Sequence, residues 1–332
     1  MIAASRGIGR PGGGGRPDIA LGCAQLGDLY RALADDEATA IVDAAWDVGI
    51  RHFDTAPHYG AGLSEWRVGR ALRGRDRDDY TISTKVGRRL ESPTGGSTAE
   101  RPHPDTQRVI DYTADGIRRT LDDSRARLGT DRIDIVFVHD PQLDPEAALT
   151  TGFAALQAMK DEGAITSIGV GTSHVDLLLR FVRETQIDTV LLSGRMTLLN
   201  QEAAAELLPE CAARGIRVLN AAVFNSGILA TDTVPVDAKY DYRPAPAELL
   251  ERARRIGDVC ADHGVRLPSA ALRYSLAAEA VAAVIVGADT PEQIVETVRL
   301  LDEHVPPALW DDLDRRSLVP SPNRSVHSGG IS

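Results

Sequence analysis

Four polar side chains suited to acid–base chemistry stand at or just beyond the ends of short apolar runs. Asp54, Lys85 and His139 each close such a run, and Tyr59 follows Asp54 after a turn at Pro57. A carboxylate, an ammonium, an imidazole and a phenol are groups that enzymes use to move protons. A charge at the mouth of a buried strand is costly unless something uses or pairs it. If the runs are neighbouring strands, we expect the four side chains to share one pocket.

Each of these residues has a structural alternative when taken alone. A strand-end Asp54 can cap the next helix, Lys85 can extend its ammonium to solvent from a strand end, and His139 can be a core residue with satisfied hydrogen bonds. The chain has only three lysines but many arginines, so a lysine at position 85 suggests a charge that can be tuned. His58 is the one rival histidine, and we assign it a substrate contact at most.

Eight short apolar runs alternate with longer amphipathic segments. Their continuous hydrophobicity is typical of parallel strands that are buried on both faces. The expected strands are Ile19–Gly22, Ile50–Asp54, Tyr80–Lys85, Ile133–His139, Ile165–Gly171, Thr189–Leu192, Arg217–Ala221 and Ala282–Val286. Expected helices include Asp35–Val48, Pro145–Glu162, Val175–Glu184, Gln201–Arg214 and Ala247–His263. Eight such units predict an α/β protein with a single (β/α)8 (TIM) barrel domain over residues 18–320.

The ends and two long connections complete this organisation. Residues 1–17 and 321–332 are expected to be flexible tails. Residues Gly7–Gly12 match the dinucleotide-binding pattern G-x-G-x-x-G. Pro11 interrupts the pattern and no strand is expected before it, so we reject this match. Residues 86–106 and 231–246 are longer than a barrel needs and follow strand ends, which favours substrate loops over neutral insertions.

Composition limits the class of protein. The 332 residues are 43% hydrophobic and 26% charged, as in a globular protein with a large core. The formal net charge of −11 argues against nucleic acid or anionic membrane as the main partner. Three widely spaced cysteines fit a reducing compartment and no metal site, and the first residues lack the apolar stretch of a secretory signal. We therefore expect a cytoplasmic protein.

The stretch around Asp54 resembles the signature of the aldo-keto reductases. It reads Phe-Asp-Thr-Ala-Pro-His-Tyr-Gly over 53–60, followed by Gly62, Ser64, Glu65, Gly69 and Leu72. The resemblance implies that Asp54, Tyr59, Lys85 and His139 form the catalytic tetrad of that family. Tyr59 would move the proton on the reacting oxygen, because Lys85 favours its phenolate and Asp54 orients Lys85. His139 would hydrogen-bond the reacting oxygen, and a nicotinamide cofactor would supply the hydride chemistry.

Two segments resemble the cofactor loops of the family. One follows the strand at 217–221, and the other follows the strand at 282–286 and opens a helix near Pro291. An ordinary βα loop is the alternative for each, but both lie on the phosphate side of a barrel. Ser193 stands where a glutamine is usual, and Ala221 stands where many members carry a tyrosine. The resulting candidate cofactor contacts are Gly22, Ser193, Phe224, Asn225, Ser226, Gly227, Leu229, Gly287, Ala288, Asp289 and Gln293.

Asp289 bears on the choice of cofactor. Many members of the family carry Arg or Lys at this place, where it holds the 2′-phosphate of NADP. A carboxylate repels that phosphate but can accept a hydrogen bond from a free ribose hydroxyl. Asp289 can also simply cap the helix that follows. We expect NAD to be preferred, with NADP possible.

Further stretches resemble the aldose 1-dehydrogenase branch of the family, which includes L-fucose, D-threo-aldose and pyridoxal dehydrogenases. They lie at 22–30, 194–199, 225–227 and 242–246, and the resemblance spans 19–318. It implies oxidation of a sugar hemiacetal at C1 to a lactone, with Tyr59 as base. We name His58 and Arg195 as candidate substrate contacts. Met196 stands where a tyrosine is common in the branch, so the sequence does not identify which sugar is the substrate.

Two alternatives stay open. The first is a reductase of the same fold that acts on an aldehyde or ketone in a biosynthetic pathway. The second is a non-enzymatic subunit that binds the cofactor and senses redox state. For the enzyme we expect a small sugar, aldehyde or alcohol as substrate, and a monomer or small homo-oligomer.

Overall fold

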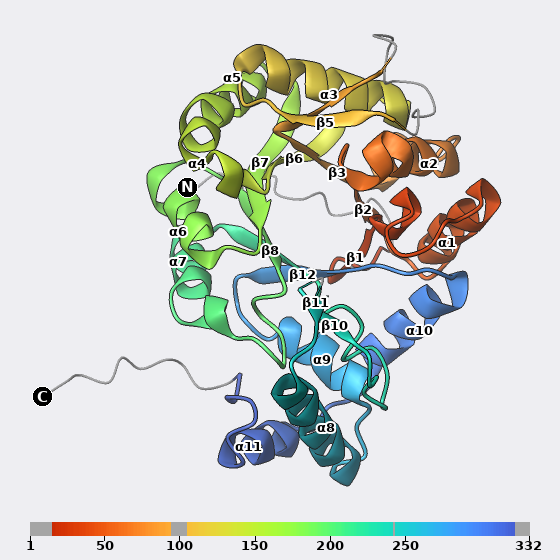
Figure 1. Cartoon of the computed structure of the whole chain (residues 1–332), viewed down its shortest axis with the longest axis vertical. Coiled ribbons are helices and arrows are strands. Elements are labelled where there is room, and N and C mark those ends of the chain that lie inside the picture. The colour runs from red at the N-terminus through yellow and green to blue at the C-terminus, as the bar shows by residue number, and fades with distance from the viewer. Residues whose placement is uncertain (1–14, 94–104, 242, 323–332) are drawn as a thin grey trace, which may run out of the picture.

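The computed structural model describes residues 15–93, 105–241 and 243–322. Eight parallel strands form its centre: β1 (Ile19–Gly22), β2 (His52–Asp54), β3 (Thr81–Val86), β6 (Ile133–His139), β7 (Ile165–Thr172), β8 (Thr189–Ser193), β9 (Arg217–Ala221) and β12 (Val281–Val286). They close into a barrel in the order β1-β12-β9-β8-β7-β6-β3-β2 (Figure 1). The predicted (β/α)8 barrel is confirmed, and strand bounds differ from the prediction by at most two residues.

Helices surround the barrel (Figure 1). They are α1 (Asp35–Asp47), α2 (Leu63–Ala71), α3 (Ala114–Leu128), α4 (Pro145–Ala147), α5 (Phe153–Asp161), α6 (Val175–Glu184), α7 (Leu207–Arg214), α8 (Ala247–Asp262), α9 (Leu267–Ser275), α10 (Pro291–Asp302) and α11 (Pro307–Arg315). The helix predicted over 145–162 contains a π-helical turn at Ala148–Gly152. The helix predicted from Gln201 begins only at Leu207, because Pro209 has no N–H and is tolerated only in a first turn.

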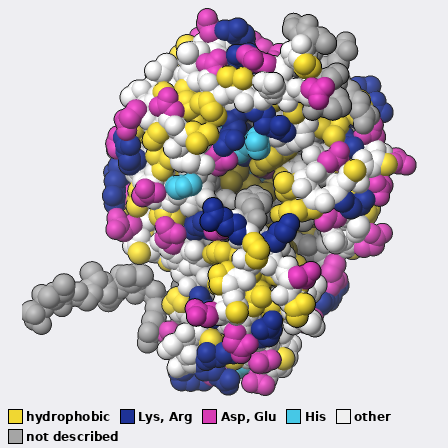
Figure 2. Space-filling model, in the orientation of Figure 1, with side chains coloured by type: hydrophobic (Ala, Val, Ile, Leu, Met, Phe, Trp, Pro, Cys, Tyr) yellow, Lys and Arg dark blue, Asp and Glu magenta, His cyan; other side chains and the backbone are white. Residues whose placement is uncertain are grey.

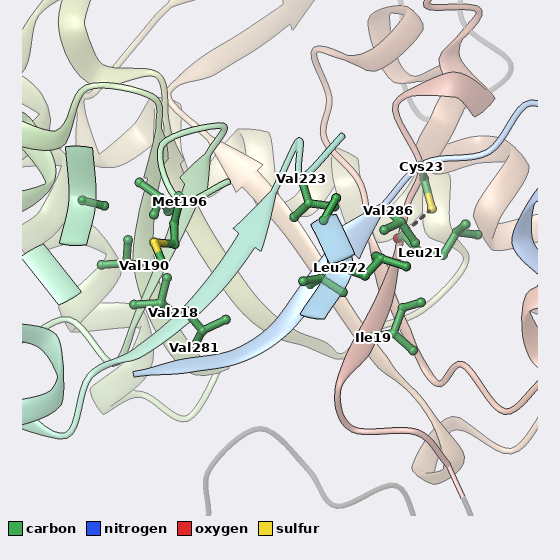
Figure 3. Packing of buried hydrophobic residues seen from close by; sticks show 14 of the residues in the cluster. Ile19, Leu21, Cys23, Val190, Met196, Val218, Val223, Leu272, Val281 and Val286 are labelled. Carbon is green, nitrogen blue, oxygen red and sulfur yellow. Dashed lines mark hydrogen bonds between the residues drawn. The ribbon is translucent and has the colours of Figure 1, made fainter. Parts of the chain in front are cut away.

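Strand pleating divides the core into two parts. One face of each strand points into the barrel, where Ala20, Ile135, Phe137, Leu191, Leu219, Ala283 and Ile285 pack together. The other face meets the helices. Figure 3 shows Ile19 and Leu21 of β1 beside Val286 of β12 and Leu272 of α9, in this outer layer. Each such buried aliphatic side chain contributes about 1.5–3 kcal/mol.

The two long connections form hairpins beside the same end of the barrel. After β3, β4 (Arg88–Glu91) pairs antiparallel with β5 (Gln107–Ile110). After β9, β10 (Lys239–Tyr240) pairs with β11 (Arg243–Pro244). The face seen in Figure 2 is hollowed at its centre, with histidine and basic side chains at the edge of the hollow. Parts of both loops, most of the two predicted tails and the Gly7–Gly12 pattern lie outside the described residues.

Within the described ranges, no helix combines the length and apolar character that crossing a membrane requires. Cys23, Cys211 and Cys260 are buried free thiols.

A buried ion pair ties α2 to α3 beneath the loop that carries Tyr59. The Arg127 Nε donates to Glu65 Oε2 at 2.7 Å, and the two side chains are 1% and 0% exposed. Thr84 of β3 donates its hydroxyl hydrogen to the other carboxylate oxygen of Glu65 at 2.5 Å. Two helices and a barrel strand therefore meet at one carboxylate.

We expect Arg127→Met to destabilise the protein by roughly 3–5 kcal/mol, because it leaves the Glu65 carboxylate buried without its cation. Urea unfolding followed by circular dichroism measures the change. The matched control is Arg118→Met, which removes an exposed ion pair with Glu162 and should cost far less. Equal losses for the two variants would contradict the importance of burial.

Candidate active site

The loop between β2 and α2 places Tyr59 over the barrel mouth. Tyr59 begins a 3-10 turn over Tyr59–Gly62 in which Gly60 has φ 60° and Ala61 has φ 51°. This turn lies directly against Gly27, in the loop after β1. A Cβ on Gly27 would lie 2.5 Å from the Tyr59 carbonyl carbon. The bare glycine backbone therefore lets the two loops touch and fixes the height of Tyr59 above the strands.

Lys85 and Asp54 form a buried ion pair in the interior of the barrel. The Lys85 Nζ donates to Asp54 Oδ2 at 2.8 Å and to the Thr55 carbonyl at 2.9 Å. The two side chains are 2% and 4% exposed. The same Nζ lies 4.8 Å from the centre of the Tyr59 ring. The ammonium thus stands between a carboxylate and a phenol, with little water to screen it.

His139, at the end of β6, completes the group. Its ring meets the Tyr59 ring edge-on, with ring centres 5.9 Å apart, and the His58 ring lies 5.7 Å away on the same side. The His139 Nε2 is 3.6 Å from Asp140 Oδ2. The structure therefore brings Asp54, Tyr59, Lys85 and His139 together as their positions at strand ends predicted, with His58 beside them.

Burial dominates the ionisation of this group. Burial raises the pKa of Tyr59 to about 12, although the nearby Lys85 ammonium works in the opposite direction. Burial also acts to lower the pKa of Lys85, but Asp54 and Tyr59 outweigh it and raise that pKa above its ordinary value. Burial and then Lys85 lower the pKa of His139 far below its usual range. At neutral pH the group therefore contains a charged lysine, a neutral histidine and a protonated tyrosine. Lys85 does favour the phenolate, as expected, but burial outweighs it.

Several buried polar atoms point at a missing partner. Among the described residues, His139 Nδ1, His58 Nδ1, the Tyr112 hydroxyl and Asn225 Oδ1 have no hydrogen-bond partner. Buried polar atoms are usually satisfied, so unpaired ones around a cleft indicate a ligand or ordered water. Tyr112, which the sequence analysis did not single out, packs against Gly87 after β3 and Gly152.

The loop after β9 is held in a strained shape. Ala222, Asn225 and Ser226 all have left-handed backbones, with φ of 55°, 47° and 58°, and Gly227 has φ 96°. Non-glycine residues adopt this region at a cost, and such residues cluster where a loop has to meet a ligand. Phe224 is half-buried beside them. The loop that the sequence predicts to contact the cofactor is therefore strained in the structure.

Leu229 and Ser193 lie at the margins of that loop. The Leu229 side chain is fully buried in the core and its N–H donates to the Phe224 carbonyl at 3.1 Å, so its side chain supports the loop from below. Ser193 ends β8 opposite Ala221 of β9. With its side chain in the core, Leu229 can face a ligand only through its backbone.

The second cofactor segment begins where β1 and β12 lie side by side. Gly22 ends β1 and Gly287 follows β12; a Cβ on Gly287 would lie 2.2 Å from Gln25 Oε1. Gln25 was not predicted as a site residue, although it lies within the stretch that resembles the aldose dehydrogenases. Ala288 is buried next to them. Gly287 therefore leaves room for the Gln25 side chain just before α10.

Asp289 does not cap α10. Thr290 is the N-cap, with its hydroxyl accepting from the Gln293 N–H at 3.4 Å, and Gln293 Oε1 accepts from the Asp289 N–H at 2.7 Å. The Asp289 carbonyl accepts from an Arg31 Nη2 at 2.8 Å. The capping alternative for Asp289 is wrong. The side-chain oxygen of Gln293 already accepts a hydrogen bond from the backbone of this loop.

Arg195 belongs to the hairpin rather than to the tetrad. Its Nη2 donates to Asp241 Oδ2 at 2.9 Å, and its Nε lies 3.5 Å from Glu202. The guanidinium therefore ties the β8 loop to the turn between β10 and β11. Arg195 could contact a substrate only while it also keeps its ion pair with Asp241.

No group of three or more His, Cys, Asp or Glu side chains is placed to hold a metal ion within residues 15–93, 105–241 and 243–322.

Comparison with known proteins agrees with this geometry. The model of the aldo/keto reductase family matches residues 18–316. The chain belongs to this family. It is similar to D-threo-aldose 1-dehydrogenase of a Pseudomonas species, with 42% identity over 92% of this chain and 95% of the relative. It is also similar to pyridoxal 4-dehydrogenase of Microbacterium luteolum, with 36% identity over 91% and 94%.

Solved structures show the same fold. The holo form of the aldo-keto reductase AKR11C1 from Bacillus halodurans superposes with a TM-score of 0.72, at 24% identity over 94% of both chains. An aldo/keto reductase from Klebsiella pneumoniae in complex with NADP and acetate gives 0.68, at 22% identity over 95% of both chains. The predicted family is confirmed, and this family member is an oxidoreductase with aldose dehydrogenase relatives.

Acid should destabilise this site in a defined pH window. Burial lowers the pKa of both His52 and His58 to about 4. The unfolded chain binds these protons near pH 6.5, so the free energy of unfolding falls as pH drops from about 6.5 to about 4. The buried His52 alone accounts for a loss on the order of 2–3 kcal/mol.

Urea unfolding at about pH 7 and pH 4.5 measures this loss, and His52→Gln, which cannot take up the proton, should reduce it. The same free energy of unfolding at both pH values would contradict the assigned burial.

Proposed function

We propose that this protein is an NAD(P)-dependent aldose 1-dehydrogenase that oxidises a cyclic sugar hemiacetal to a lactone, with Tyr59 as the acid–base residue. The observation that carries the proposal is the buried Lys85 ammonium, 2.8 Å from Asp54 and 4.8 Å from the Tyr59 ring centre. The 42% identical D-threo-aldose 1-dehydrogenase supports the substrate class. The subunit that only senses cofactor is disfavoured by a complete tetrad, which binding alone does not require.

The chemistry divides between the cofactor and the tetrad. When bound, an oxidised nicotinamide would supply the hydride-acceptor chemistry at C1. Tyr59, as phenolate, takes the proton of the C1 hydroxyl group, so that the C–H and O–H bonds break while the C=O bond of the lactone forms. Lys85 stabilises the phenolate, and neutral His139 holds the sugar oxygen by a hydrogen bond. Since the pKa of Tyr59 is raised to about 12, the oxidation rate should climb with pH over the neutral to alkaline range.

The same side chains support the reverse direction. At neutral pH the raised pKa keeps Tyr59 protonated, which is the form that donates a proton to a carbonyl oxygen during reduction. A reductase acting on an aldehyde or ketone is therefore the second candidate, and the pH dependence of the two directions distinguishes the physiological one.

The residues around the mouth fit a dinucleotide. The loop at 222–227, held in its left-handed backbone shape, would lie along the pyrophosphate, and the N-terminus of α10 would face the adenosine phosphates. Asp289, free of the helix cap, would accept a hydrogen bond from a ribose 2′-hydroxyl, so we propose a preference for NAD. Arg31 lies next to Asp289 and is the cation that would hold the 2′-phosphate if NADP also binds.

Three buried free thiols suit a reducing compartment, which supports a cytoplasmic location. A monomer or a small homo-oligomer stays a prediction.

Tyr59→Phe should lower the kcat for aldose oxidation at least a hundredfold, the scale of acid–base catalysis, while binding of the nicotinamide cofactor stays close to wild type. The measurement is a screen of aldoses and pyridoxal with NAD and NADP, following absorbance of the reduced nicotinamide. Cofactor binding is followed separately by quenching of tryptophan fluorescence.

The matched control is Tyr80→Phe, which removes a phenol at the start of β3, at the opposite end of the barrel from the tetrad. It should leave kcat unchanged. Wild-type turnover by Tyr59→Phe would show that Tyr59 is not the acid–base residue.

Asp289→Arg should raise kcat/KM with NADP about tenfold or more and lower it with NAD, because the new cation attracts the 2′-phosphate that the carboxylate repels. Steady-state kinetics with both cofactors on wild type and variant measure the change. Glu292→Arg makes the same change of charge at an exposed position one turn away and is the control. A wild-type preference for NADP would overturn the role of Asp289.

A further inference from the structure

Two polar side chains lie inside the barrel directly below Asp54 and Lys85. His52 precedes Asp54 by two residues on β2, and Ser83 precedes Lys85 by two residues on β3, so each pair shares the inner face of its strand. The Ser83 Oγ is 2.6 Å from Asp54 Oδ1, and the His52 Nε2 is 2.9 Å from the same Oγ. The exposed fractions are 8% for His52 and zero for Ser83. A continuous chain of hydrogen bonds therefore runs His52–Ser83–Asp54–Lys85.

The chemistry of the groups fixes the direction of each hydrogen bond. An ionised carboxylate can only accept, so the Ser83 hydroxyl donates to Asp54 Oδ1. With its one hydrogen used, Ser83 accepts, and His52 Nε2 must be the protonated nitrogen of a neutral ring. Asp54 then has one donor on each oxygen: Ser83 on Oδ1 and Lys85 on Oδ2. The carboxylate is held from both sides and cannot rotate.

The charges around His52 keep this arrangement constant. Asp54 on its own strand, Lys85 on β3, Asp134 on β6 and Arg217 on β9 act on its ring, two of them as anions and two as cations. Burial outweighs them and lowers the pKa of His52 to about 4, so the ring stays neutral wherever the enzyme is expected to work. His52 is therefore a permanent donor rather than a proton carrier.

We propose that Ser83 and His52 are positioning residues of the active site: they hold the Asp54 carboxylate so that the Lys85 ammonium stays between Asp54 and Tyr59. The inference rests on the proposed function, since it concerns the rate at which Tyr59 exchanges a proton. Without Ser83, Oδ1 is a buried charged oxygen with no donor. The carboxylate then rotates to share both oxygens with Lys85 and draws the ammonium away from Tyr59.

Displacement of the Lys85 ammonium changes the pKa of Tyr59 in a defined direction. A phenolate farther from the ammonium is less stable, so the pKa of Tyr59 rises and its ionisation moves to higher pH. Ser83→Ala should therefore move the rising limb of the pH–kcat profile toward alkaline pH and lower kcat at neutral pH about ten- to a hundredfold, as small displacements of catalytic groups do. The KM for the cofactor should not change, because neither side chain lies in the proposed cofactor loops.

The experiment compares three serine variants of the full-length protein. Ser83→Ala removes the hydroxyl, and Ser83→Thr keeps it and should restore the wild-type limb. Ser167→Ala is the matched control: Ser167 is a buried β7 residue whose hydroxyl has no hydrogen-bond partner among the described residues. It should leave the limb unmoved.

His52→Gln and His52→Met test the far end and remain informative if Ser83→Thr does not fold. Glutamine retains an N–H donor and should keep the wild-type limb, while methionine should shift it in the same direction as Ser83→Ala. Lys85→Met removes the cation altogether and should give the largest shift of the rising limb of the pH–kcat profile.

If Ser83→Ala and His52→Met lose thermal stability but keep the wild-type limb, the two residues are structural only and the inference is overturned. That outcome leaves the proposed function intact. The proposed function fails separately, if wild type oxidises no aldose with either cofactor or if Tyr59→Phe keeps its turnover.

Discussion

The structure depends on one ammonium group that water cannot reach. Lys85 is charged inside the barrel mouth at a desolvation cost of several kcal/mol, which its partners must offset. Its Nζ has three hydrogens: one goes to Asp54, one to the Thr55 carbonyl and the third is directed toward Tyr59. Any shift of Asp54 or Thr55 therefore moves the charge that Tyr59 experiences. The surrounding fold can be understood as the frame that keeps these distances fixed.

The frame around Tyr59 is built mainly from backbone contacts and buried hydroxyls. Gly27 touches the turn that carries Tyr59, and Ser64 at the start of α2 donates to the Cys23 carbonyl at 2.6 Å and lies 2.8 Å from the Thr55 hydroxyl oxygen. The loops after β1 and β2 are thereby locked together. Beneath them, Glu65 joins α2 to α3 and to β3. A catalytic side chain on a loop gains the rigidity of the barrel through such contacts.

On the opposite side of the mouth, the loop after β9 has a strained backbone. There the left-handed backbones of Ala222, Asn225 and Ser226 hold a loop open in a shape that free chains avoid. The large apolar core can sustain this local cost, because it stabilises the strands from which the loop leaves. A preformed loop loses little entropy when a ligand binds. The two sides of the mouth thus differ in kind: a rigid charged group faces a strained, uncharged loop.

Much of this protein can be predicted from its sequence, because strand and helix patterns are local. Continuous apolar runs separated by amphipathic segments predict the barrel. Polar residues at strand ends predict the grouping of Asp54, Lys85 and His139, since parallel strands bring those ends together. The family resemblance around Asp54 follows from the same few residues, and the family match confirms it. Pro209 also shows why one helix boundary was misplaced, since the apolar pattern upstream continued past a residue that limits where a helix begins.

Only the tertiary structure decides how these residues act on one another. The pKa of Tyr59 depends on the balance of burial against Lys85, two long-range effects that no spacing encodes. Asp289 could be a helix cap or a free carboxylate by sequence, and only the backbone shows that Thr290 is the cap. His52 and Ser83 occupy ordinary strand positions, and their contact with Asp54 follows from the register of β2 against β3. Local pattern determines which residues reach the barrel mouth, whereas register, burial and loop contact determine what each can do there.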